Sequence, residues 1–74
     1  MKSVTTLRFR KALKELPPGI RKTAEHAFQL WQENTFHPGL KFKQIHKRKS
    51  IYSVRVGLAW RAIGIKEGDT MIWF

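Results

Sequence analysis

The amino-acid sequence predicts a small α+β domain, in which an N-terminal helical hairpin packs on one face of a twisted antiparallel sheet of about four strands. Apolar residues in the first half of the chain recur at the spacing of an amphipathic helix. In the second half, apolar and polar residues alternate with the period of a half-buried strand. The chain has 74 residues and no cysteine, so we expect one domain, residues 1–74, without a disulfide or a thiolate metal site.

The first helix is predicted over residues 6 to 16. Thr5 and Thr6 offer a hydroxyl N-cap, and apolar residues follow at helical spacing with basic residues opposite them. An alternative is that Val4 begins a short edge strand. The helix should end at Pro17-Pro18-Gly19, because a residue that precedes proline is disfavoured in α geometry.

A second helix is predicted over residues 18 to 34, with Pro18 in its first turn. Its apolar stripe includes Trp31, which we expect in the core together with Trp73. The short connection predicts that the two helices pack as an antiparallel hairpin.

The rest of the chain predicts a meander of strands at residues 40–46, 50–57, 59–66 and 70–74. Short turns at 47–49 and 67–69 connect these strands, which makes neighbouring strands antiparallel. On the second strand, Arg55 alternates with the apolar residues Val54 and Val56. Since two helices can cover only one face of a sheet, we expect Arg55 on the open face.

Charge predicts the class of partner. Fifteen lysines and arginines against five acids give a net charge of +10, and no acid lies between Glu33 and Glu67. Such clustering indicates contact with nucleic acid, although an acidic protein or anionic lipid would also suit it. The alternative is a basic domain with scattered solubilising lysines, and the uneven distribution of the acids argues against it. The sequence shows no signal peptide and no apolar run of membrane-spanning length, so we expect a cytoplasmic protein without a membrane partner.

Sequence motifs add a family resemblance that covers nearly the whole chain. After the helices come the segments HPGLKFK, YSVRVG, AWRAIG and EGDTMIWF. In this order they resemble the RelE/ParE toxin superfamily of bacterial toxin–antitoxin systems. The resemblance implies two helices against a twisted antiparallel sheet, with the family's usual first strand reduced or absent here.

The resemblance also implies an activity, because many members of the superfamily are ribosome-dependent mRNA endoribonucleases. They use no metal or cofactor, and the 2′-hydroxyl of the RNA attacks the adjacent phosphate. Arg61 matches the arginine of the family's Tyr-Arg motif and is the candidate for binding the scissile phosphate; Arg55 is expected to act similarly, and His46 is the candidate for proton transfer. The further candidates for RNA binding are Lys41, Lys43, Lys47, Arg48 and Trp60.

Each candidate has a structural alternative. The arginines suit a solvated sheet surface, and the lysines of an edge strand deter unwanted strand pairing. His46 suits an ordinary surface position, as His26 and His37 do, and Trp60 suits a core or rim position better than base stacking. The sequence contains no cluster with metal-ligand spacing and no nucleophile–base pair.

The end of the chain leaves the activity open. In nuclease members, the last strand runs into a segment with an Arg or His and a Tyr that assist acid–base chemistry, whereas this chain ends at Phe74. We therefore expect a toxin domain that lacks this C-terminal segment. The alternatives are a ParE-like inhibitor of DNA gyrase and an inactive toxin that still binds antitoxin. A membrane-active amphipathic protein, suggested by the basic first helix, is a third hypothesis.

The resemblance implies a cognate antitoxin as partner, together with mRNA and the ribosome, or DNA gyrase in the alternative. The positive charge would accelerate an encounter with an acidic segment, and an exposed strand edge offers a place for β-augmentation. An apolar last strand at the end of the chain also predicts a homodimer or a strand swap through this fourth strand.

Overall fold

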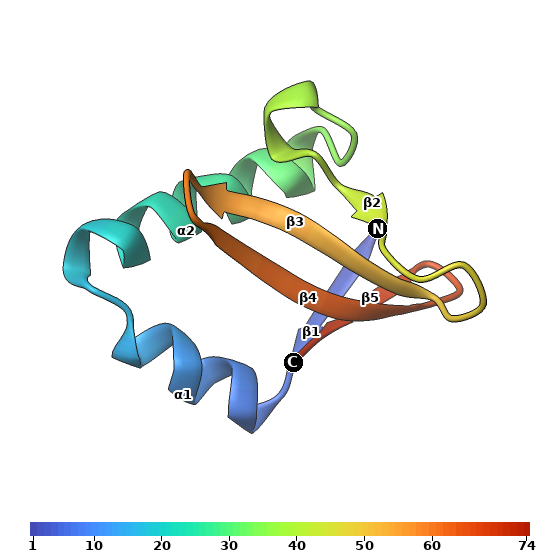
Figure 1. The fold of residues 1–74 in the computed structure, drawn as a ribbon, viewed down its shortest axis with the longest axis horizontal. Helices are drawn as coiled ribbons and strands as arrows, with labels where there is room; N and C mark the ends of the chain where they lie inside the picture. Colours follow the sequence, from blue (N-terminus) through green and yellow to red (C-terminus); the bar gives the residue numbers. More distant parts are fainter.

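The computed structural model describes all 74 residues and forms one mixed sheet with helices on one face (Figure 1). Its elements are β1 (Lys2–Thr5), α1 (Leu7–Glu15), α2 (Pro18–Glu33), the 3₁₀ helix η1 (Pro38–Leu40), β2 (Lys43–Gln44), β3 (Ile51–Gly57), β4 (Trp60–Glu67) and β5 (Thr70–Trp73). The five strands lie in the order β1-β5-β4-β3-β2. All neighbours are antiparallel except β1 and β5, which are parallel. The α+β prediction is confirmed, whereas a wholly antiparallel sheet of four strands is wrong.

The additional strand is β1, at the start of the chain. Its Lys2 N–H donates to the Asp69 carbonyl at 2.7 Å, and its Ser3 Oγ accepts the indole N–H of Trp73 at 2.9 Å. The alternative of a short edge strand at Val4 is therefore confirmed. The first strand, expected to be reduced or absent, is present with four residues. Because β5 pairs with β1 on one side and β4 on the other, it has no free edge for a second copy; dimerisation through it would require exchange of the strand and stays a prediction.

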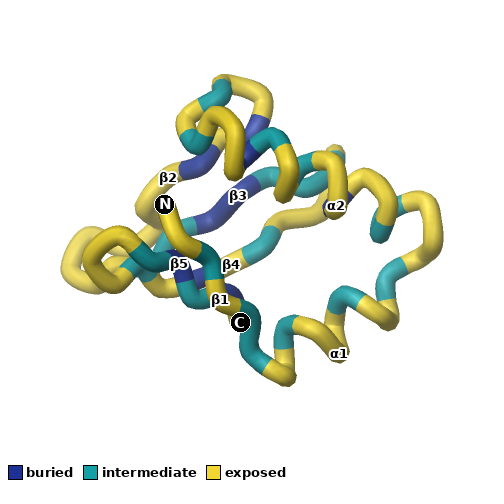
Figure 2. Tube along the Cα trace, turned by 180° about the vertical axis from the view of Figure 1, so that it is seen from behind, coloured by how far each residue is buried: buried dark blue, intermediate teal, exposed yellow.

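Helix α1 begins where the sequence predicts, but it does not pack closely. The Thr6 side chain caps it by accepting the Phe9 N–H at 3.1 Å. None of its residues is buried, and it diverges from α2 instead of forming the expected close hairpin (Figures 1 and 2). A side-chain contact joins the two helices where they are nearest, because the Arg21 guanidinium donates to the Lys14 carbonyl at 2.7 Å. Neither helix has the length and apolar character to cross a membrane.

Only two residues of the strand predicted at 40–46 form a strand in the structure. His37 caps η1 through its Nδ1, which accepts the Gly39 N–H at 3.1 Å, and Pro38 occupies the first turn. Lys41 then adopts a left-handed conformation, with φ 47° and ψ 43°. Strand β2 consequently contains only Lys43 and Gln44, which lie opposite Ser53 and Tyr52, and one further hydrogen bond joins Ile45 to Ile51. The alternation of residues predicted a longer strand because it could not show the left-handed backbone.

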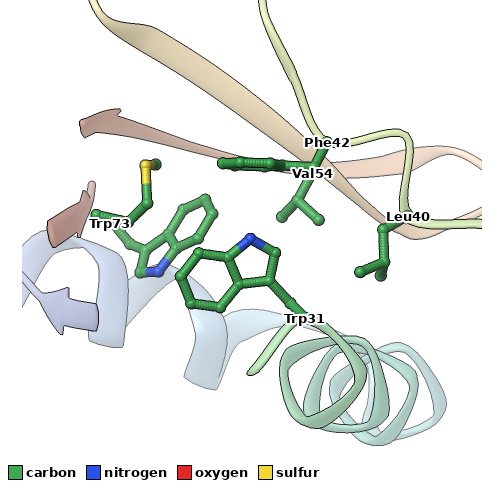
Figure 3. Close-up of a cluster of buried hydrophobic side chains, with 6 residues drawn as sticks. Trp31, Leu40, Phe42, Val54 and Trp73 are labelled. Carbon is green, nitrogen blue, oxygen red and sulfur yellow. The ribbon is translucent and has the colours of Figure 1, made fainter. Parts of the chain in front are cut away.

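The core lies between α2 and the sheet, around Trp31 (Figure 3). The Trp31 ring is 5.5 Å from the Trp73 ring and 5.8 Å from the Phe42 ring, and both contacts are edge-to-face. No hydrogen bond reaches the buried Trp31 Nε1, but Figure 3 shows this nitrogen turned toward Phe42, where an N–H···π contact can satisfy it. Gly64 leaves room for the Trp73 ring, because a Cβ there would lie 2.9 Å from that ring and 2.8 Å from the Met71 side chain. The predicted core positions of Trp31 and Trp73 are confirmed. An apolar cavity of about 360 Å³ remains between α1, α2 and the helix-facing side of the sheet.

Candidate nucleic-acid interface

The face of the sheet opposite the helices carries the two candidate arginines. On β3, Tyr52, Val54 and Val56 pack with the core. Alternation along the strand therefore directs Arg55 to the open face, as the sequence predicts. Arg61 lies directly opposite Arg55 on the neighbouring strand β4 and shares its face.

Each arginine is held by a hydrogen bond within the sheet. The Arg55 Nε donates to the Gly57 carbonyl at 3.2 Å, and the Arg61 Nη1 donates to the Ser53 Oγ at 3.4 Å. Ser53 is 1% exposed, so it gives Arg61 a fixed anchor at the sheet surface. Like charges at directly opposite positions of a sheet are unfavourable. An anion between the two guanidinium groups would remove this repulsion.

The Lys41 side chain lies beside Arg55 and Arg61. Lys41, Arg55 and Arg61 line one hollow of about 400 Å³ beside the turn between β3 and β4. The remaining lining residues are Gly57, Leu58, Ala59 and Trp60, and none of the seven is acidic. We call this site the cationic hollow. Lys43 lies on the same face, opposite Ser53, and extends the positive surface.

The arrangement suits a phosphate group. Guanidinium groups offer paired N–H donors that match phosphate oxygens, and lysine adds a mobile positive charge. The left-handed backbone of Lys41 is unfavourable for a residue with a side chain, and such conformations concentrate at functional sites. The sequence indicated a turn at Pro38-Gly39, but no pattern in it could show that the turn brings Lys41 to the two arginines.

The other basic candidates lie in a separate loop. His46, Lys47 and Arg48 follow β2, at the end of the sheet where β3 begins, and all three are exposed. The His46 Nδ1 accepts the Arg48 N–H at 3.2 Å. Arg55 lies four positions along β3 from its first residue, Ile51, which is about 13 Å at the usual rise of a strand. The structure therefore does not bring His46 to the cationic hollow.

Trp60 stands at the rim of the hollow. It is 40% exposed, and its side chain lies against Gly57, where a Cβ would be 3.6 Å from the indole. One side of the ring is thus supported, and the exposed part is accessible from the hollow. No group of three or more His, Cys, Asp and Glu side chains in the structure is arranged to hold a metal ion.

Comparison with known proteins identifies the family. The model of a family described as the ParE-like toxin domain matches residues 18–74, from the first residue of α2 to Phe74. The chain belongs to this family. It is a toxin domain of the RelE/ParE superfamily, as the resemblance in its sequence motifs predicted.

A solved structure supports the assignment of this toxin domain. The chain is similar to one in the crystal structure of the RelB–RelE antitoxin–toxin complex from Methanococcus jannaschii, with 30% sequence identity and a TM-score of 0.76. The similarity covers 95% of this chain and 82% of that chain, so it extends into α1, which lies outside the family match. A comparison with curated protein sequences gives no match.

Proposed function

We propose that this toxin is a metal-independent endoribonuclease that cleaves mRNA on the ribosome and binds the scissile phosphate in the cationic hollow. The observation that carries the proposal is the opposed pair of Arg55 and Arg61 with Lys41 beside it and no acid in the lining. Three cations placed together in a site that holds only water repel one another without any compensating interaction. A bound phosphate would neutralise their positive charge.

In the proposed reaction, the 2′-hydroxyl oxygen of the RNA attacks the adjacent phosphorus. The hydroxyl loses its proton, the bond from phosphorus to the 5′-oxygen breaks, and that oxygen takes up a proton. The products are a 2′,3′-cyclic phosphate and a 5′-hydroxyl. Negative charge grows on the phosphate oxygens in the transition state, so prearranged cations stabilise it more than the ground state.

The residues of the hollow divide this work. Arg61, fixed on the buried Ser53, orients the phosphate, while Arg55 and Lys41 balance the charge that develops. Arginine and lysine do not exchange protons readily at neutral pH, so proton transfer depends on other groups. His46 lies beyond the start of β3, more than about 13 Å along the sheet from Arg55, so it would contact a neighbouring nucleotide rather than the same phosphate. Together with Lys47 and Arg48 it extends the proposed RNA path, and Trp60 offers a face for one base.

We also propose that an antitoxin protein controls this toxin. The support is the similarity to a chain that was crystallised in an antitoxin–toxin complex, together with the net charge of +10. An acidic segment would be attracted to such a surface.

Cleavage in a translating extract, mapped by primer extension, tests the nuclease proposal. We expect Arg61→Ala to lower the cleavage rate by about 100-fold, the usual effect of removing one donor to a developing charge. Arg61→Lys keeps the charge but loses the paired N–H donors of the guanidinium group. Its cleavage rate should therefore lie between those of Arg61→Ala and the wild-type toxin. Lys11→Ala is the control, because Lys11 is exposed on α1 outside the hollow. Intact mRNA with the wild-type toxin would show that the nuclease proposal is wrong.

A second candidate function is inhibition of DNA gyrase by protein contact. It is favoured by the match to a ParE-like domain and by the lack of any histidine or carboxylate in the lining of the hollow. Inhibition of DNA supercoiling without RNA cleavage would select this function. If expression of the chain does not slow bacterial growth and neither activity is measured, the chain is an inactive toxin.

A further inference from the structure

A narrow apolar space runs beneath α1, on the side of the sheet that the helices cover. It consists of a cavity of about 360 Å³, lined mainly from α2, and a hollow of about 270 Å³, lined mainly from α1 and β4. The two adjoin, because both are lined by Phe9, Leu13, Ala24, Val56 and Ala62. We call the cavity and the hollow together the α1 channel.

Small side chains and a loosely packed helix keep the α1 channel open. Ala24 on α2 and Ala62 on β4 form its walls, where larger side chains would fill it. Helix α1 diverges from α2 and has no buried residue, although Phe9 and Leu13 face the channel (Figure 1). Protein interiors rarely contain voids much larger than a water molecule, whereas ligand pockets have volumes of about 300–1,000 Å³. A space of this size therefore indicates a ligand site.

One part of the α1 channel borders the cationic hollow. Trp60 and Arg61 line both the β4 side of the channel and the cationic hollow. Arg61 is the one charged residue among the eleven that line the β4 side, and the other ten are hydrophobic. Its only hydrogen bond is from Nη1 to Ser53, so its Nε and Nη2 retain free N–H donors. Apolar walls that end at a guanidinium group suit an anion with an apolar tail.

We propose that the α1 channel binds the anion of a single-chain fatty acid, with the alkyl chain between α1 and the sheet and the carboxylate on Arg61. The carboxylate oxygens accept the free N–H groups of the guanidinium, and the chain removes the apolar walls from water. A carboxylate on Arg61 excludes a phosphate from the same group. This effect on RNA rests on the proposed nuclease function, whereas binding of the fatty acid does not.

The dimensions of the α1 channel argue against other occupants. One turn of a helix, about 10 Å across and 5.4 Å long, takes up about 420 Å³, which is more than the cavity of about 360 Å³ holds. A protein helix therefore does not fit beneath α1. RNA does not fit either, because Arg61 is the only cation in the lining. A neutral alkyl chain would fill the walls but leave Arg61 without an anion.

Calorimetric titration with decanoate, below its micellar concentration and at 0.15 M salt, tests the proposal. Decanol is the matched ligand, because it has the same chain without the charge. We expect one equivalent of decanoate to bind, and decanol to bind about tenfold more weakly. Equal binding of the two ligands would show that Arg61 contributes nothing. Several equivalents of decanoate would show association with the basic surface as a whole, and either result would overturn the proposal.

Variants that fill the channel locate the alkyl chain. Ala24→Leu should weaken decanoate binding about 20-fold, and Ala62→Val, which narrows the channel from the sheet, about fivefold. Gln32→Leu is the matched control, since Gln32 is exposed on α2 and lines neither part of the channel. Circular dichroism identifies the variants that fold, and Ala62→Val decides if Ala24→Leu does not. Unchanged affinity in a folded channel variant would contradict the proposal.

Removal of the cation at the border tests the position of the carboxylate. Arg61→Gln should weaken decanoate about tenfold and leave decanol unchanged. Lys11→Gln removes the same charge from the exposed side of α1, outside the channel, and should have little effect. If the two variants weaken decanoate equally, the attraction comes from net charge, and the carboxylate is not on Arg61.

Leucine methyl NMR gives the location without a substitution. Leu13 lines both parts of the channel and Leu16 its β4 side, whereas Leu7 and Leu40 line neither. Decanoate added to toxin with ¹³C-labelled leucine methyl groups should shift the signals of Leu13 and Leu16 and leave those of Leu7 and Leu40. Binding without a shift at Leu13 and Leu16 would overturn the proposal.

Competition with a short RNA oligonucleotide separates this inference from the proposed nuclease function. Decanoate should displace RNA from the wild-type toxin but not from Ala24→Leu. Simultaneous binding of decanoate and RNA would show that the carboxylate does not lie on Arg61. If decanoate binds with the expected methyl shifts but mRNA is not cleaved, the nuclease function is wrong and the fatty-acid site stands. If mRNA is cleaved and decanoate does not bind, only the fatty-acid site is wrong.

Discussion

At the scale of one residue, the proposed function of Lys41 conflicts with stability. It is the only residue other than glycine with a positive φ. A left-handed conformation costs a residue with a side chain about 1–2 kcal/mol, whereas glycine adopts it freely. The same conformation places Lys41 in the lining of the cationic hollow beside the arginines. We infer that this strain is retained because the third cation is needed there.

Lys41→Gly should therefore separate binding from stability. The relief of strain is larger than the entropic cost of glycine, so the free energy of unfolding should stay equal or rise by up to about 1 kcal/mol. Affinity for a short RNA should fall about tenfold with the loss of one charged contact. Urea unfolding and fluorescence anisotropy measure the two effects.

Lys43→Gly is the matched control for this prediction. Lys43 is paired in β2 with Ser53, where glycine lowers the free energy of unfolding by about 0.5–1 kcal/mol. If Lys41→Gly destabilises the protein as much as Lys43→Gly does, the left-handed backbone of Lys41 is not a source of strain.

At the scale of elements, the sequence predicted the helices and strands whose apolar residues recur regularly and whose ends are marked by nearby turn residues. Helix α2 and strands β3, β4 and β5 lie within a residue or two of their predicted ranges. Strand β1 was weakly predicted because its partner, β5, lies at the other end of the chain, and pairing over that distance leaves no local pattern. The strand predicted at 40–46 failed for the opposite reason, since its alternation was clear but η1 and Lys41 interrupt it.

In the candidate site, too, the sequence predicted what depends on local pattern and missed what depends on the backbone fold. Alternation on β3 was sufficient to place Arg55 on the open face, and the family motif indicated Arg61. The approach of Lys41 depends on a backbone angle, and the separation of His46 depends on strand pairing, so neither could be predicted from spacing in the sequence.

Helix α1 should be the least protected element of the fold. Its cap at Thr6 is well formed, but none of its residues is buried, so little tertiary packing opposes its opening. Hydrogen exchange followed by NMR should show faster exchange for the amides of α1 than for those of α2. Thr6→Ala removes a cap worth about 1 kcal/mol and should accelerate exchange in α1 about fivefold.

Thr23→Ala provides the control on the neighbouring helix. Thr23 is exposed, and its hydroxyl donates to the Gly19 carbonyl within α2, so the substitution should leave exchange in α1 unchanged. Equal protection of α1 and α2 in the wild-type toxin would contradict the inference that α1 is loosely held.

For the whole molecule, the positive charge is unbalanced over a very small volume. The fold measures 33 × 27 × 20 Å and carries a net charge of +10. At 0.01 M salt the screening length is about 30 Å, so every charge repels nearly every other across the fold, whereas at 0.15 M it is about 8 Å. The compact state is therefore destabilised at low salt, and any acidic partner that lies on the molecule relieves the same repulsion.

Thermal unfolding at increasing salt concentration tests this inference. Between 0.01 and 0.15 M sodium chloride, we expect the midpoint of unfolding to rise by about 5 °C, which corresponds to about 1 kcal/mol for a domain of this size. Replacing Lys47 and Lys49 by Gln removes two charges from an exposed loop and should reduce the rise. A midpoint that falls with salt would mean that attractive pairs outweigh the repulsion. The expected rise instead means that the free toxin is least stable at low salt, where its attraction to any anionic partner is strongest. Binding of such a partner would then also stabilise the fold.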